Sequence, residues 1–111
     1  MTDREVLEGL HGLEAKLRRD MDQVPFGARR YNMGLIVIGV RRISDQLNAV
    51  RRPESPRDLA LVELRKLYAL ARSVRADASR TNVTAGECEI WDRTVNAIRD
   101  LGKRANPEIE A

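Results

Sequence analysis

The chain of 111 residues is 33% charged and 42% hydrophobic, and it carries a formal net charge of +3 at pH 7. This composition predicts one globular domain and excludes an intrinsically disordered chain. The longest apolar run, residues 35–40, is far shorter than the ~20 residues of a membrane-spanning helix, so no membrane span is predicted.

Two residue types further narrow the fold class and the possible kinds of site. Aromatic residues make up only 4% of the chain, so the core must consist of Leu, Ile, Val and Ala, a choice that favours helices over sheets. Cys88 is the only cysteine, which excludes an internal disulfide and a multi-cysteine metal site. The first residues are acidic and amphipathic, unlike a secretory signal. A single cysteine best fits a reducing compartment, so we expect a cytoplasmic protein.

The first predicted helix begins at Thr2 and ends before Pro25. Thr2 and Glu5 have the spacing of a capping box, in which the hydroxyl and the carboxylate satisfy free amides of the first turn. Phe26, just after the helix, is expected to plug the end of the fold. The apolar stripe repeats every three or four residues and comprises Val6, Leu10, Leu13, Leu17 and Met21.

The second predicted helix starts near residues 28–31, ends around Arg51 before Pro53, and is the most apolar segment of the chain. Leu35, Val37 and Ile38 point away from its main stripe, so its first half is apolar on every side. We therefore expect this helix to be central in the fold or covered by a second copy of the protein. The stripe comprises Met33, Ile36, Val40, Ile43, Leu47 and Val50.

Residues 35–40 taken alone also resemble a short buried strand. The three- and four-residue spacing, however, continues through residues 41–49, where no two-residue alternation exists. A lone strand would also leave its backbone groups unpaired. The helix is the prediction we adopt.

The third predicted helix has Ser55 as its N-cap and Pro56 at its first position. Its stripe comprises Ala60, Leu64, Leu67, Ala71, Val74 and Ala78. The fourth begins at Thr84, which forms a capping box with Glu87, and Gly102 is expected to be its C-terminal cap. Its predicted inward stripe comprises Cys88, Trp91, Val95 and Ile98, so Cys88 is interpreted as a core residue.

These four segments are joined by short connections. Short connections favour neighbouring antiparallel helices, so the predicted fold is an all-α, antiparallel up-down-up-down four-helix bundle. We expect residues 1–104 to form the single domain and residues 105–111 to form a flexible C-terminal tail.

The sequence contains only weak signals for catalytic or metal-binding residues. Glu8 and His11 have the Glu-x-x-His spacing of di-iron bundles, but those sites need a second histidine and this chain has one. The pairs Glu5/Glu8 and Glu89/Asp92 suggest a magnesium site, yet an antiparallel bundle places the starts of helices one and four at opposite ends. We therefore predict no catalytic residue, no metal and no cofactor.

Basic residues are concentrated in the middle of the chain. Residues 23–80 contain 12 basic and 5 acidic side chains, whereas both ends are mildly acidic. Arg30, Arg41 and Arg52 recur every eleven residues and therefore lie on one face of the second helix. Basic residues of the third helix are expected to extend this line: Arg57, Arg65, Lys66, Arg72 and Arg75.

The leading hypothesis is a non-enzymatic interaction module: a small regulatory or inhibitory bundle, of a size that fits a phage or mobile-element factor. It would bind itself, as a homodimer, or a larger protein, and the predicted partner-binding residues are Leu35, Ile38, Arg30, Arg41 and Arg52. A nucleic-acid-associated protein using the basic residues of 29–80 is the alternative. A magnesium-dependent enzyme with a carboxylate cluster is the third hypothesis.

Overall fold

The computed structural model describes residues 3–25, 27–48, 56–80 and 83–105 of the chain. The described residues form helices and turns without a strand, which confirms the predicted all-α class. None of these helices is long and apolar enough to cross a membrane. The helices are α1 (Asp3–Met21), α2 (Ala28–Asn48), α3 (Pro56–Arg80) and α4 (Ala85–Ala105).

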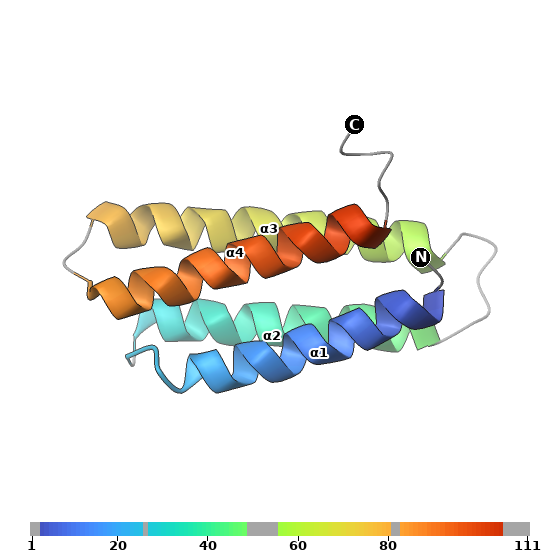
Figure 1. The fold of residues 1–111 in the computed structure, drawn as a ribbon, viewed down its shortest axis with the longest axis horizontal. Coiled ribbons are helices and arrows are strands. Elements are labelled where there is room, and N and C mark those ends of the chain that lie inside the picture. The colour runs from blue at the N-terminus through green and yellow to red at the C-terminus, as the bar shows by residue number, and fades with distance from the viewer. Residues whose placement is uncertain (1–2, 26, 49–55, 81–82, 106–111) are drawn as a thin grey trace.

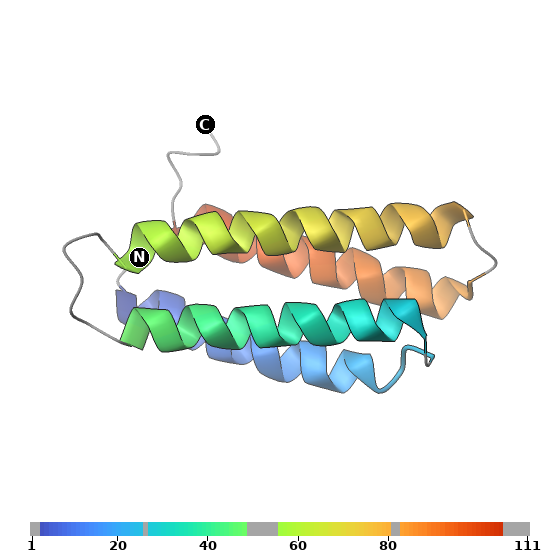
Figure 2. The ribbon, with the colours of Figure 1, turned by 180° about the vertical axis from the view of Figure 1, so that it is seen from behind.

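Each helix packs against two others. α1 contacts α2 and α4, and α3 also contacts α2 and α4. Figure 1 shows α1 and α4 in front, and Figure 2 shows α2 and α3 from the opposite side. The edge formed by α1 and α2 and the edge formed by α3 and α4 therefore lie on opposite sides of an elongated body measuring 47 × 28 × 18 Å.

The starts of α3 and α4 follow the sequence signals. α3 begins at Pro56, which suits a first helical position because its missing N–H would have no partner there. At α4, the backbone N–H of Glu87 donates a hydrogen bond to Oγ1 of Thr84 at 3.2 Å, as the capping box predicts. The other predicted caps, Thr2 and Ser55, lie outside the described residues, as does Phe26.

The predicted C-terminal cap at Gly102 is wrong, because α4 continues through it to Ala105. Gly27, before α2, is the one described residue with a positive φ, so Gly102 does not adopt the left-handed conformation of a cap. Ala105 is only 2% exposed. Packing of this last turn against the core accounts for the continued helix.

One stripe of each helix is buried in a common core. The stripes predicted for α1 and α2 are confirmed at most positions, with Leu10, Leu17, Met33 and Ile36 fully buried. Val37 is the exception, because it is 5% exposed although it was expected to point away from the stripe. Val37 directly follows the buried Ile36. Arg41, one helical turn after Val37, lines a hollow shared with α1, so Val37 lies on the side of α2 toward α1.

The buried arc of α4 is rotated from the predicted stripe. Cys88, predicted to be inward, is only partly buried, whereas its neighbour Glu87 is 4% exposed and Ile90 is 3% exposed. Thr94 is fully buried, and its hydroxyl donates a hydrogen bond to the carbonyl of Ile90 at 2.9 Å. The buried arc of α4 thus includes polar side chains, which hydrophobic periodicity does not detect. A polar side chain can be buried there when a hydrogen-bond or ion-pair partner offsets the cost of removing it from water.

Two glycines allow close approach between helices. A Cβ atom at Gly39 of α2 would lie 2.6 Å from Cδ2 of Leu67 in α3. A Cβ atom at Gly9 of α1 would lie 2.6 Å from Cδ1 of Leu101 in α4. By contrast, no atom lies within 4 Å of the Cβ position of Gly12, on the exposed side of α1.

Replacing glycine with alanine should therefore have opposite effects at two positions. Gly12→Ala should raise the free energy of unfolding by about 0.5–1 kcal/mol, because alanine favours helix and nothing blocks its methyl group. Gly39→Ala should lower it, because displacing the Leu67 side chain costs about 1–3 kcal/mol and exceeds that gain. Urea denaturation measures both, and equal stabilisation by the two substitutions would contradict the close contact.

Candidate interaction surface

The outward face of α2 carries three large apolar side chains. Tyr31 is 68% exposed, Leu35 is 38% exposed and Ile38 is 51% exposed. Spacings of four and three residues place them in one stripe, which we call the α2 outer stripe. Two of the predicted partner-binding residues thus lie together at the surface. Sequence reasoning missed Tyr31, although its position four residues before Leu35 was a usable signal.

Charged side chains flank the α2 outer stripe. Arg42 and Asp45, both exposed, follow Ile38 by four and seven residues and so continue the same face of the helix. Arg41, also exposed, lies three residues after Ile38 on the side toward α1. The stripe is therefore an apolar strip bordered by charges of both signs, a pattern that interaction surfaces often have.

The predicted basic line on α2 is only partly described. Nη2 of Arg30 lies 3.4 Å from Oδ1 of Asp22, in the connection between α1 and α2. Arg41 lines a shallow hollow between the two helices, and Arg52 lies outside the described residues. Arg30 and Arg41 thus both lie along the α1–α2 edge. The hollow is lined by His11, Glu14, Arg18, Arg41, Ser44 and Asp45.

The arginines of α3 do not extend this line. Arg65, Arg72 and Arg75 line hollows between α3 and α4, on the opposite side of the molecule from the α1–α2 edge. Nε of Arg75 also donates a hydrogen bond to Oδ1 of Asp92 at 2.6 Å, and this bond raises the pKa of Arg75. The expected continuous basic surface over α2 and α3 is therefore divided between two edges.

The two carboxylate pairs suggested for magnesium do not converge. Glu8 precedes Gly9, which lies against Leu101 near the end of α4, whereas Glu89 and Asp92 lie near its start. Within the described residues, no group of three or more His, Cys, Asp or Glu side chains is arranged to hold a metal ion.

A partly buried ion pair connects the starts of α2 and α4. Arg29 donates hydrogen bonds from Nε and Nη2 to the two carboxylate oxygens of Glu87, with 3.2 Å between Nη2 and Oε2. The side chain of Glu87 is 3% exposed and that of Arg29 is 32% exposed. Hydrogen bonding to Glu87 raises the pKa of Arg29 and so favours its charged form. Because the two residues are 58 positions apart, local sequence patterns could not detect this pair.

Comparison of the chain with protein-family models, curated proteins and solved structures finds no match.

The Arg29–Glu87 pair should make a measurable contribution to stability. Arg29→Met would leave the Glu87 carboxylate buried without its cation, so the free energy of unfolding should fall by about 1–3 kcal/mol. The exposed pair of Arg4 and Glu8 provides the control, and Arg4→Gln should change stability by less than about 0.5 kcal/mol. Urea denaturation measures both, and equally small effects would contradict a structural role for the buried pair.

Proposed function

We propose that the chain is a non-enzymatic protein-interaction module with a regulatory or inhibitory role. The observation that supports this proposal is the α2 outer stripe, in which Tyr31, Leu35 and Ile38 are all exposed. Single exposed apolar residues are common, but a contiguous strip of them on one helix is typical of a binding surface. A cytoplasmic location, inferred from the single cysteine, is part of the proposal.

The occupant we propose for the α2 outer stripe is a second copy of the chain. In a two-fold symmetric dimer the same surface of both copies meets, so the pattern must be self-complementary. Tyr31 and Asp45 each lie seven residues, about two helical turns, from Ile38. A two-fold axis beside Ile38 would place the Tyr31 hydroxyl of one copy opposite the Asp45 carboxylate of the other. That arrangement pairs a donor with an acceptor at both ends of the apolar contact.

We also propose that the four helices form an antiparallel up-down-up-down bundle. Two contacts between α1 and α4 support this order. Gly9, near the start of α1, lies against Leu101, near the end of α4. Asp20, near the end of α1, pairs with Arg93 in the first half of α4, with 3.5 Å between Oδ1 and Nη2. In this arrangement α2 is flanked by α1 and α3 and leaves one face, the α2 outer stripe, to a partner.

Light scattering coupled to size-exclusion chromatography tests the dimer. The purified chain should have a mass near twice 12.6 kDa. Leu35→Glu combined with Ile38→Glu should reduce the mass to that of the monomer, because two carboxylates would be buried against each other at the interface. Asn96→Glu, an exposed position on α4 away from α2, is the control and should leave the dimer intact. A monomeric parent chain would contradict the proposal.

Nucleic-acid binding is the second candidate function. The observation that favours it is the position of Arg30 and Arg41 along one edge of the molecule, with Arg42 also exposed nearby. Arginine side chains spaced along a helix can contact successive phosphate groups. The separation of the α3 arginines onto the opposite edge limits the length of nucleic acid that one copy would contact.

If this second function is correct, duplex DNA should bind at about 50 mM salt and dissociate as salt rises. Replacing Arg30, Arg41 and Arg52 together with Gln should weaken binding and reduce the slope of log affinity against log salt by about one for each arginine. The control removes the same charge from α4, by replacing the exposed residues Arg99, Lys103 and Arg104 with Gln. No binding at low salt, or equal effects of the two triple variants, would exclude this function for the basic line.

A further inference from the structure

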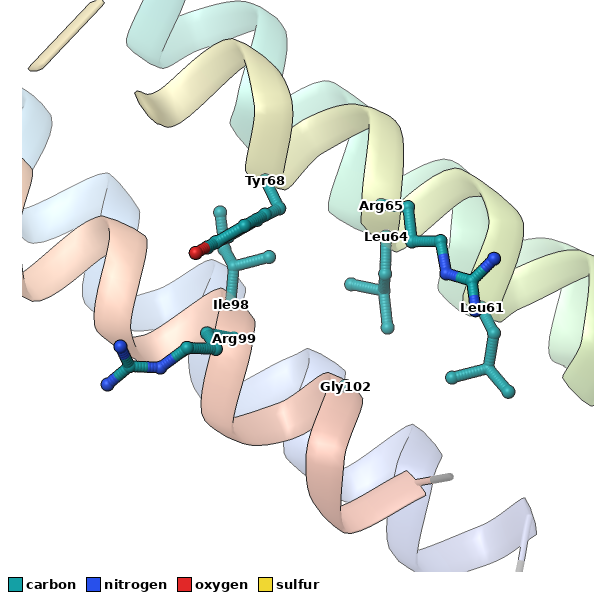
Figure 3. A pocket seen from close by; sticks show the side chains of 7 residues that line it. All are labelled: Leu61, Leu64, Arg65, Tyr68, Ile98, Arg99 and Gly102. Carbon is teal, nitrogen blue, oxygen red and sulfur yellow. The ribbon is translucent and has the colours of Figure 1, made fainter. Parts of the chain in front are cut away.

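A hollow between α3 and α4 combines an apolar floor with a basic rim. Its volume is about 210 Å³, and it lies on the edge of the bundle away from the α1–α2 edge. Figure 3 shows Leu61, Leu64 and Tyr68 extending from α3 toward α4. The hollow is lined by Leu61, Leu64, Arg65, Tyr68, Ile98, Arg99 and Gly102.

The floor of the hollow is apolar and already formed. Leu61 is 7% exposed, Leu64 is 2% exposed and Ile98 is 1% exposed, so each of these side chains is held by the core. Gly102 contributes open space, because no atom lies within 4 Å of the position that its Cβ would occupy. A ligand group entering here would therefore contact ordered aliphatic side chains without first displacing one of them.

The rim supplies positive charge from both helices. Arg65 of α3 and Arg99 of α4 are exposed, and Arg65 makes no ion pair with another described residue. Nε of Arg99 lies 3.7 Å from the adjacent carboxylate of Asp100, but both side chains are largely exposed and water weakens the attraction. Figure 3 shows the two guanidinium groups at opposite ends of the hollow, that of Arg65 on the side of Leu61 and that of Arg99 on the side of Ile98. A guanidinium group beside an apolar floor favours an anion with an apolar body.

The volume of the hollow limits the size of the apolar part of the ligand. An engineered apolar cavity of about 150 Å³ binds benzene, and pockets for drug-sized ligands are about 300–1,000 Å³. At about 210 Å³, the hollow fits one ring and a short link to a charged group. An extended acidic peptide would continue into the next hollow along the same edge, where the Asp92 carboxylate is part of the lining.

From these observations we infer that the α3–α4 hollow binds a small arylcarboxylate. The ring lies on Leu61, Leu64 and Ile98 in the space beside Gly102, and the carboxylate accepts hydrogen bonds from Arg65 at the Leu61 end of the hollow. The Tyr68 side chain borders the hollow, and the guanidinium of Arg72 lies 5.7 Å from the centre of its ring. This cation–π contact favours the observed position of the Tyr68 ring. The inference is independent of the α2 outer stripe and of its occupant.

Titration of the ¹⁵N-labelled full chain with sodium phenylacetate, followed by amide chemical shifts, tests the inference. The expected result is saturable shifts concentrated in residues 61–68 and 98–102. The neutral analogue 2-phenylethanol should bind at the same place several-fold more weakly, because it cannot form an ion pair with Arg65. Shifts that do not saturate, or that are spread evenly over the four helices, would overturn the inference.

Two variants separate the floor from the rim. Gly102→Leu should abolish the shifts, because its Cβ position is open and its longer side chain would occupy the hollow that Gly102 lines. Gly12→Leu, at an equally open position on α1, is the matched control and should bind phenylacetate like the parent chain. Replacing both Arg65 and Arg99 with Gln should reduce phenylacetate affinity to that of 2-phenylethanol. Unchanged binding in Gly102→Leu, or in the double arginine variant, would overturn the inference.

Discussion

Burial of the inner stripe of α2 is the constraint on which the rest of the structure depends. Met33, Ile36, Val40 and Ile43 are each at most 1% exposed. Burial of each such side chain contributes about 1.5–3 kcal/mol, which must offset the conformational entropy lost on folding. Aromatic residues supply little of the core, with Trp91 the one fully buried example among the described residues. The helices must therefore approach closely enough for aliphatic side chains to fill the interior.

Close approach determines which faces remain outside. Gly39 permits α3 to lie tightly against α2, and Gly9 does the same for α1 and α4. Once α1 and α3 flank α2, one side of this very apolar helix has no neighbour among the described residues, and the α2 outer stripe occupies it. On another face, α3 and α4 leave the hollow beside Gly102. The two proposed sites thus arise from the same packing but face different directions, so occupation of one does not block the other.

The sequence predicted the helices more accurately than the orientation of their faces. Helix starts could be predicted from the sequence because capping depends on residues within one turn, as at Thr84. The burial of Val37, the partial exposure of Cys88 and the helical conformation of Gly102 were not predicted. Each depends on which neighbouring helix covers the position, and residues far away in the chain decide this. In the α2 outer stripe, Leu35 and Ile38 were identified from the periodicity of the sequence. The hollow lined by Arg65 and Arg99 could be located only once the packing of α3 against α4 was known.

The amino-acid sequence by itself determined the all-α class, the beginnings of α3 and α4 and most of the buried stripes, because these properties depend on local periodicity and capping. The tertiary structure alone decided how the charged residues are used. Glu87 illustrates the difference: the sequence identifies its backbone N–H as capped by Thr84, but its carboxylate is bound by Arg29, from another helix. Ion pairs and hollows join residues that are distant in the chain, so their partners are determined by helix packing rather than by spacing along the sequence.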